Sequence, residues 1–167
     1  MPTEIPVFST CDLCDADKDP SNGDLRVLPP LFRDFGGVTR FAGPISTVQC
    51  LEDNSRVREA VMSAGGGRVL VVDGGGSLKR SLLGGNLAQA AEKNGWAGVL
   101  VFGAVRDAAE MRARQVGIRA LGLTPMPTER RDQGLRDVPV QIAGEWLRPG
   151  EWLYADEDGI VVKRNAA

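Results

Sequence analysis

Residues 68–105, RVLVVDGGGSLKRSLLGGNLAQAAEKNGWAGVLVFGAV, decide the fold of this 167-residue chain. The stretch opens with a continuous apolar run at Arg68–Val72, which is typical of a strand buried on both faces of a sheet. A helix is predicted over about Asn86–Asn94, and Trp96–Val105 is the next buried strand. Strand, helix and strand in about 35 residues predict a βαβ unit, and therefore two parallel neighbours in one sheet.

Residues at helix boundaries refine this prediction. Asn86 is a candidate N-cap with Gln89 three residues later, which is the spacing of a capping box. An earlier helix begins after an N-cap at Asp53 or Asn54. Gly65 ends that helix, in the position where glycine relieves a left-handed cap. Its apolar stripe has helical spacing and consists of Val57, Ala60, Val61 and Ala64.

Further strands and a helix flank the βαβ unit. Val38–Leu51 is rich in β-branched residues and is predicted to be extended, with a candidate break at Gly43-Pro44. After the unit, a short helix at Ala108–Arg114 leads to another strand at Val116–Leu123. These segments extend the predicted sheet on both sides.

The two ends of the chain differ from its centre. Residues 1–30 are polar and rich in proline, and they predict an N-terminal arm with a short helix around Thr10–Ala16. Short strands separated by turn dipeptides predict an antiparallel C-terminal meander of Val138–Ile142, Trp146–Leu147, Trp152–Tyr154 and Ile160–Val162. We therefore expect residues 1–167 to form a single α/β domain with one mixed sheet.

The chain contains no histidine. This absence excludes Ser-His-Asp and Cys-His catalytic sites, an imidazole general base, and histidine-ligated zinc or iron. Acid–base chemistry is therefore left to carboxylate, cysteine, lysine, tyrosine or water. Any metal is expected to be a hard cation held by oxygen, which means magnesium, manganese or calcium.

Charge and cysteine content indicate the cellular setting. The chain has 20 Lys and Arg against 22 Asp and Glu, which leaves no basic footprint for nucleic acid. Cys11, Cys14 and Cys50 form an odd set, and Cys11-x-x-Cys14 lacks the second pair that a zinc site needs. The first residues, MPTEIPVF, do not resemble a signal peptide, and no apolar run reaches about 20 residues. These features predict a cytoplasmic protein with reduced thiols and no contact with a membrane.

Glycines cluster at 65–67, 74–76 and 84–85. The middle cluster follows a strand at its carboxyl end, where open α/β sheets place their sites. A dinucleotide fingerprint would need glycine in place of Lys79, and a methyltransferase-like pattern would need it in place of Ser77. No Gly-Lys pair exists, so there is no P-loop. A tight turn is the simpler interpretation of residues 74–76.

The third cluster opens a helix with Gly84, Gly85, Asn86 and Leu87. The first amides of a helix lack internal partners and carry the positive end of its dipole. Glycine lets an anion approach them closely, so a carboxylate or phosphate would fit there. The alternative is an ordinary helix start without a ligand.

Arg106 and Asp107 follow the strand that ends at Val105. Arg106 can bind a carboxylate through two hydrogen bonds, and Asp107 can ligate a hard cation. Glu110, one helical turn further on, could hold a water molecule beside the cation or be a solvated helix residue. The alternative for Arg106 and Asp107 is an ordinary surface ion pair. Together with the helix amides, these residues would bind a small α-keto acid.

The chain resembles the RraA-like family, which contains regulators of ribonuclease E activity and 4-hydroxy-4-methyl-2-oxoglutarate aldolases. The resemblance covers roughly residues 9–163. The residues that carry it are Phe41–Val48, Glu52–Asn54, Val69–Ser77, Gly84–Ala88, Gly95–Gly98, Gly103–Asp107 and Tyr154–Gly159. Some similar proteins carry the older label of demethylmenaquinone methyltransferase.

This resemblance implies a swivelling β/β/α fold and a homotrimer or hexamer with sites near the subunit contacts. It also implies a class II pyruvate aldolase that uses Mg²⁺ or Mn²⁺ and decarboxylates oxaloacetate. By position, Arg106 binds the substrate and stabilises the enolate, and Asp107 ligates the metal. The amides of Gly84, Gly85, Asn86 and Leu87 then receive the pyruvyl carboxylate.

One residue departs from the family pattern of Asp, twenty residues, and Arg-Asp: Gly85 occupies the first Asp position. Longer aldolases also have a C-terminal extension that contributes to a neighbouring site. The alternative function is a non-catalytic regulator that binds and inhibits ribonuclease E. The acidic run Asp156-Glu157-Asp158 could meet a basic partner, although a solvated hairpin turn is the simpler interpretation.

Overall fold

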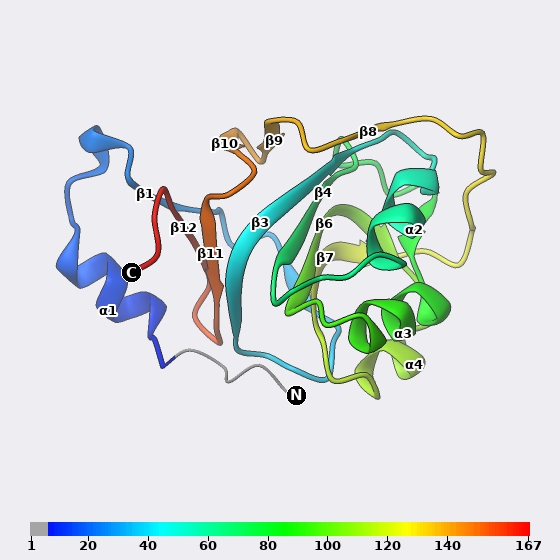
Figure 1. The fold of residues 1–167 in the computed structure, drawn as a ribbon, viewed down its shortest axis with the longest axis horizontal. Coiled ribbons are helices and arrows are strands. Elements are labelled where there is room, and N and C mark those ends of the chain that lie inside the picture. Colours follow the sequence, from blue (N-terminus) through cyan, green and yellow to red (C-terminus); the bar gives the residue numbers. More distant parts are fainter. Residues whose placement is uncertain (1–6) are drawn as a thin grey trace.

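The computed structural model describes residues 7–167, so residues 1–6 of the predicted N-terminal arm lie outside the description. Within this range a ten-stranded mixed sheet runs through the molecule, and α2, α3 and α4 cover one of its faces (Figure 1). The parallel strands are β3 (Phe41–Gln49), β4 (Val69–Asp73), β6 (Gly98–Val105) and β7 (Gly117–Leu123). The helices between them are α2 (Ser55–Val61), α3 (Gly85–Lys93) and α4 (Ala108–Arg112). The predicted βαβ unit and the mixed α/β class are confirmed.

Antiparallel strands extend the sheet beyond β3 and along β7. The strands beyond β3 are β11 (Trp152–Ala155), β12 (Ile160–Lys163) and β1 (Leu25–Val27), in that order. The sequence did not predict β1, β2 (Arg33–Asp34), β5 (Ser81–Leu83) or β8 (Leu135–Arg136). The predicted meander is divided, because β9 (Val140–Ile142) and β10 (Glu145–Leu147) pair only with each other. The predicted N-terminal helix is present as α1 (Thr10–Ala16), followed by a 3-10 turn, Pro20–Asn22.

Strand β3 continues through the break that was predicted at Gly43-Pro44, and it changes partners there. Phe41–Pro44 pairs antiparallel with β11, whereas Ile45–Gln49 pairs parallel with β4 on its other side. Proline lacks the N–H that a central ladder uses, so it is tolerated where pairing passes from one neighbour to the next. The strand therefore joins the parallel and antiparallel parts of the sheet.

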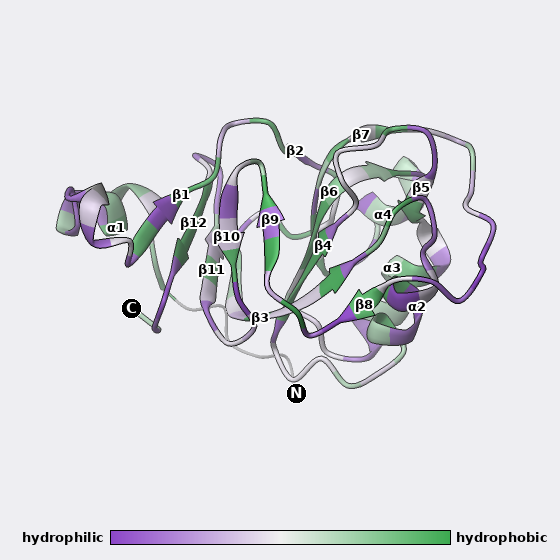
Figure 2. Cartoon of the chain, turned by 90° about the horizontal axis from the view of Figure 1, so that it is seen from above, coloured by the Kyte–Doolittle hydropathy of each residue, from purple (hydrophilic) through white to green (hydrophobic). Residues whose placement is uncertain are grey.

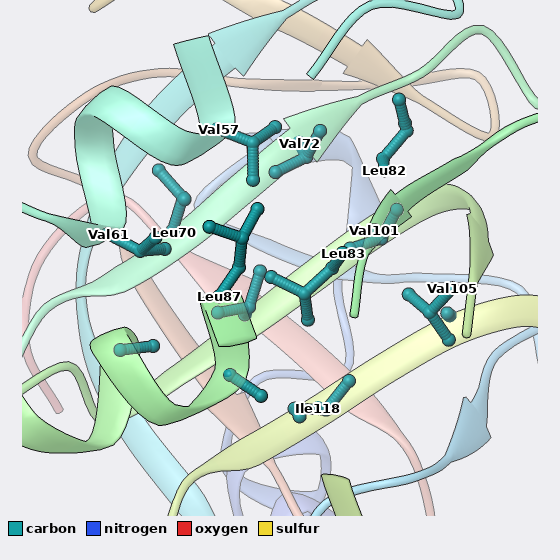
Figure 3. Close-up of a cluster of buried hydrophobic side chains, with 14 of the residues drawn as sticks. Val57, Val61, Leu70, Val72, Leu82, Leu83, Leu87, Val101, Val105 and Ile118 are labelled. Carbon is teal, nitrogen blue, oxygen red and sulfur yellow. The ribbon is translucent and has the colours of Figure 1, made fainter. Parts of the chain in front are cut away.

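Both faces of the parallel strands are buried. In β4, Leu70 and Val72 face the helices, while Val69 and Val71 belong to a second core on the opposite face. Figure 3 shows part of the helix-side core, where Leu87 of α3 lies among residues of α2 and the strands. The second core lies beneath the β9–β10 hairpin and includes Ile142. Burial on both faces explains why the sequences of these strands are apolar runs. In Figure 2, β4 and β6 are accordingly green, the colour of hydrophobic residues.

The helices start and end differently from the prediction. α2 ends at Val61, so Ala64 is exposed and does not belong to the apolar stripe. Gly65 lacks the predicted left-handed conformation, which occurs instead at the next two glycines. α3 begins at Gly85 with Gly84 as its N-cap, so the predicted capping box at Asn86 is wrong. Among the described residues, no helix has the length and apolar character needed to cross a bilayer.

Candidate active site

The ends of two parallel strands bring the predicted site residues together. β5 pairs with β6 so that Leu83 lies opposite Val105, and the Arg106 amide donates to the Leu83 carbonyl at 2.9 Å. The next residue on one strand is Gly84, which caps α3, and on the other it is Arg106. The start of α3 and the Arg106-Asp107 pair are therefore neighbours because both follow adjacent strand ends.

Asp107 is held in an unusual backbone conformation at this point. Its φ of 64° and ψ of 51° are left-handed, a conformation that costs a non-glycine residue about 1–3 kcal/mol. Its Oδ2 accepts a hydrogen bond from the Gly85 amide at 2.8 Å. A Cβ on Gly84 would lie 2.8 Å from the same oxygen, so glycine at 84 leaves the room that the carboxylate occupies. The side chain is exposed, and its Oδ1 has no hydrogen-bond partner among residues 7–167.

The first turn of α3 offers amides to a ligand. The Gly85 amide is taken by Asp107, and the Ala88 amide donates to the Gly84 carbonyl at 2.9 Å. Within the described chain, the amides of Asn86 and Leu87 have no acceptor. Free amides at the positive end of a helix favour an anion, and a carboxylate is the anion of an α-keto acid.

These groups border one cavity of about 330 Å³. Arg106 is half-buried in its wall, and its Nη1 donates to the Pro125 carbonyl at 3.3 Å. The lining consists of Asn54, Ser81, Gly84, Gly85, Asn86, Leu87, Arg106, Asp107, Pro127, Thr128 and Arg130. The structure therefore brings Arg106, Asp107 and the start of α3 to a single cavity, whereas Glu110 does not line it.

The sequence did not identify the other side of this cavity. Asn54, predicted only as an N-cap, caps α2 without a side-chain bond to it. Instead its Oδ1 accepts from the Thr128 hydroxyl at 2.7 Å and from the Arg130 Nε at 3.1 Å. Its Nδ2 donates to the Leu82 carbonyl at 3.3 Å. This buried amide thus fixes a second guanidinium, that of Arg130, at the cavity. Arg130 belongs to the connection between β7 and β8, which is largely hydrophilic (Figure 2).

Asp53 anchors the same connection to α2. Its Oδ1 accepts from the Ser55 amide at 2.9 Å, and its Oδ2 accepts from the Arg131 amide at 2.7 Å. Burial alone would raise the pKa of this carboxyl, but the bonds from Ser55 and Arg131 hold the pKa below its usual value. Asp53 is 1% exposed and stays ionised, so it supports the wall of the cavity without lining it.

The glycine cluster at 74–76 is a packed turn. The Gly74 and Gly76 amides both donate to the Phe102 carbonyl at 3.1 Å, and the Gly75 amide donates to the Asp73 carboxylate at 2.9 Å. All three amides are therefore used within the turn. Ser77 closes it through a 2.9 Å bond from its hydroxyl to Glu52. The interpretation of residues 74–76 as a tight turn is confirmed, and these three amides are not available to a ligand.

The oxygen ligands near the cavity are few. Within residues 7–167 there is no group of three or more His, Cys, Asp and Glu side chains arranged to hold a metal. Asp107 and Glu110 are the carboxylates beside the start of α3. Mg²⁺ keeps several waters and is commonly held by one or two protein carboxylates plus substrate oxygens, so this donor set fits such an ion. The cysteines lie elsewhere, and burial raises the pKa of the Cys50 thiol to about 12.

The chain belongs to the RraA-like family: the family model described as Aldolase/RraA matches residues 10–162. A curated relative from Albidiferax ferrireducens is 59% identical over 165 residues, which cover 94% of this chain and 95% of that protein. It is provisionally named 4-hydroxy-4-methyl-2-oxoglutarate aldolase. The predicted membership of the family is thereby confirmed.

Solved structures share the whole fold. The RNA-processing inhibitor RraA from Thermus thermophilis is 43% identical, with a TM-score of 0.91 over 97% of this chain and 96% of that chain. A protein from Geobacillus kaustophilus, described as an S-adenosylmethionine: 2-dimethylmenaquinone methyltransferase, is 42% identical with a TM-score of 0.90. That match covers 95% of this chain and 96% of the other. The predicted fold class is confirmed by these neighbours.

Proposed function

We propose that this protein is a lyase of the aldolase type that cleaves 4-hydroxy-4-methyl-2-oxoglutarate into two molecules of pyruvate. Oxaloacetate decarboxylation is its expected side activity. The name of the curated relative supports this reaction. The observation that carries the site is the meeting of Arg106, Asp107 and the free amides of Asn86 and Leu87 at one cavity.

The proposed cofactor is a divalent cation, Mg²⁺ or Mn²⁺, held by the free oxygen of Asp107. When bound, it would supply Lewis-acid stabilisation of the negative charge on the enolate oxygen. A Schiff-base mechanism has less support, because none of the four lysines lines the cavity. Asp107 is fixed by the Gly85 amide, so its second oxygen is directed without further reorganisation.

The chain's own residues would bind and orient the substrate. The amides of Asn86 and Leu87 receive the carboxylate of the pyruvyl half, and Arg106 faces its keto oxygen. The C3–C4 bond then breaks, its electron pair becomes the enolate, and the C4 hydroxyl loses its proton. The enolate carbon takes up one proton, so the reaction needs no net proton source. Arg106 stabilises the enolate through its positive charge.

Arg130 is our candidate for the distal half of the substrate. Its Nε is bound to Asn54, and its terminal nitrogens have no acceptor among the described residues. It lines the same cavity as Arg106. Two guanidiniums in one cavity suit a ligand with two carboxylates, and this substrate has a carboxylate at each end.

The decisive experiment measures pyruvate release from 4-hydroxy-4-methyl-2-oxoglutarate and from oxaloacetate, with and without EDTA. We expect both activities to be lost in EDTA and restored by Mg²⁺ or Mn²⁺. Asp107→Ala should abolish both. Asp137→Ala is the matched control, because Asp137 is also exposed and left-handed but does not line the cavity. Full activity in Asp107→Ala would overturn the site assignment.

The second candidate function is regulation of RNA processing, and the RNA-processing inhibitor from Thermus thermophilis supports it. We propose binding to ribonuclease E as the test, with the purified proteins at low salt. Absence of binding there would remove this candidate. We also propose that the protein is cytoplasmic and that its one-domain chains assemble as a homotrimer or hexamer. Sedimentation of the purified protein measures the number of chains in the assembly.

A further inference from the structure

Arg130 borders two cavities, so two sets of anionic groups compete for its guanidinium. The first is the candidate active-site cavity, which it shares with Arg106. The second, of about 420 Å³, is lined mainly by α2 and contains the carboxylates of Glu59 and Asp132. Both carboxylates already accept from Arg56, at 3.0 and 2.7 Å. A carboxylate has room for about four hydrogen bonds, so each could also bind a second guanidinium.

A single bond in the structure directs Arg130 to the first cavity. Its Nε donates to the Oδ1 of Asn54 at 3.1 Å, whereas its terminal nitrogens have no acceptor among residues 7–167. Arg130 is exposed, and a free arginine side chain has many rotamers, including those turned toward the second cavity. Asn54 is 8% exposed and lines the first cavity but not the second. The bond therefore holds the guanidinium at the active-site cavity and leaves its outer nitrogens free for an anion.

Asn54 is itself fixed from two sides. Its Oδ1 also accepts from the Thr128 hydroxyl at 2.7 Å, and its Nδ2 donates to the Leu82 carbonyl at 3.3 Å. One buried amide thus joins the start of α2, β5 and the β7–β8 connection. Because this acceptor cannot move freely, Arg130 loses little further side-chain freedom when it binds a ligand.

An ordinary N-cap would use this side chain differently. Asparagine is favoured at such positions because its oxygen accepts from an amide in the first turn of the helix. Asn54 precedes α2 but makes no such bond. Its oxygen is given instead to Thr128 and Arg130, while Asp53 accepts from the Ser55 amide. The stability of α2 does not explain a bond to an exposed arginine, whereas the placement of a guanidinium does.

We propose that Asn54 is a positioning residue: it holds Arg130 at the active-site cavity and thereby sets a preference for α-keto acids with a second, distal carboxylate. This inference rests on the proposed function, in which Arg106 and the α3 amides bind the α-keto acid end. A distal carboxylate then meets a guanidinium that is already directed at it and gains a charge-assisted pair. An α-keto acid with an apolar distal end gains nothing there.

The test compares two ligands of five carbons that lack the C4 hydroxyl and are therefore not cleaved. 2-Oxoglutarate ends in a carboxylate, and 2-oxopentanoate ends in a methyl group. Calorimetry measures the affinity of each for the full-length protein in buffer with Mg²⁺. We expect the wild type to bind 2-oxoglutarate about tenfold more tightly, because one charge-assisted pair is gained. Asn54→Ala should bring this ratio to within twofold of that in Arg130→Gln, with the affinity for 2-oxopentanoate unchanged.

A double-mutant cycle shows whether Asn54 acts through Arg130. In the Arg130→Gln background, Asn54→Ala should have no further effect on the ratio, because no guanidinium is left to position. Asn94→Ala is the control. Asn94 also donates from its side-chain amide to a backbone carbonyl, that of Val61 at 2.8 Å, but it lines neither cavity. It should keep the wild-type ratio.

Arg130→Lys tests the same bond without removing the buried amide. Lysine keeps the positive charge but has no Nε–H that could bind Asn54 while the charged end faces a ligand. We expect the ratio to fall about as far as in Asn54→Ala, and a wild-type ratio would contradict the proposal. Thermal unfolding of each variant confirms that it is folded.

The outcomes separate this inference from the proposed function. If Asn54→Ala keeps the wild-type ratio while Arg130→Gln loses it, the role of Asn54 is wrong and the proposed function stands. The same holds if Asn54→Ala weakens the binding of both ligands equally. If the wild type binds the two ligands equally, Arg130 faces no distal carboxylate and the inference is wrong. Failure of the proposed function is seen separately, as the absence of pyruvate release from 4-hydroxy-4-methyl-2-oxoglutarate.

Discussion

Asp107 and Asp156 are the same residue type in opposite situations. Asp156 is 1% exposed, and its carboxylate accepts from the Thr10 hydroxyl at 2.6 Å and the Thr10 amide at 2.8 Å. It also accepts from the Asp158 amide at 3.0 Å. Asp107 is exposed, accepts one hydrogen bond from within the described chain, and has a left-handed backbone.

The difference separates a carboxylate that holds the fold from one that is available to a ligand. At Asp156 burial alone would raise the pKa, but the bonds from Thr10, Asp158 and Gly159 hold the pKa below its usual value. Both carboxylate oxygens accept hydrogen bonds there, and the bonds from Thr10 attach α1 to the main sheet. At Asp107 the fold accepts backbone strain and leaves an oxygen free, which is the pattern expected of a functional site.

The largest expected effect is on catalysis at Asp107. We expect Asp107→Asn to lower kcat for pyruvate release about 10³-fold, because the cation's contribution to transition-state stabilisation is several kcal/mol. Asparagine tolerates the left-handed conformation, so the melting temperature should stay close to that of the wild type. Asp137→Asn should change neither quantity. A large loss of stability in Asp107→Asn would mean that this aspartate, like Asp156, is structural.

The next largest effect is on folding at Asp156. Asp156→Ala leaves the hydroxyl and amide of Thr10 and the amide of Asp158 without their acceptor. We expect the free energy of unfolding in urea to fall by about 3 kcal/mol at pH 7. The folded variant should keep the wild-type kcat. Glu157→Ala is the control, since Glu157 is exposed and, within residues 7–167, pairs only with the half-buried Arg40. Equal losses in the two variants would contradict this assignment.

These two aspartates also show what sequence reasoning could and could not reach. The strand end before Arg106 and the amides at the start of α3 follow from local pattern, so their meeting was predictable from the βαβ unit. The run at 156–158 was interpreted as a solvated turn, which is right for Glu157 and Asp158 but wrong for Asp156. Its partner Thr10 is 146 residues away, and no local pattern encodes that contact.

The far wall of the cavity was missed for a similar reason. Arg130 and Arg131 are adjacent in a connection without periodicity, and nothing in the sequence distinguishes them. In the structure, the Arg131 amide binds Asp53, and the Arg130 side chain binds Asn54. Only the long-range bonds from the start of α2 decide which of the two guanidiniums faces the cavity.

Arg130 provides a smaller test of the difference between ligand-binding and structural groups. We expect Arg130→Gln to raise KM for 4-hydroxy-4-methyl-2-oxoglutarate about tenfold, because one charge-assisted pair to a carboxylate is lost. Arg131→Gln should leave KM unchanged, since only its backbone amide is used. Steady-state kinetics of the two variants check this. An equal KM in both would mean that Arg130 does not contact the substrate.

The smallest expected effect is the acid dependence of stability that Asp156 contributes. Its pKa in the folded protein is lowered, so the unfolded chain takes up a proton more readily than the folded one as the pH falls. The contribution is fully present above about pH 4 and is lost progressively as the pH falls through the lower, folded pKa. Urea unfolding between pH 6 and pH 3 should therefore show a steeper loss in the wild type than in Asp156→Asn, which cannot titrate there. Equal slopes in the two proteins would contradict this assignment.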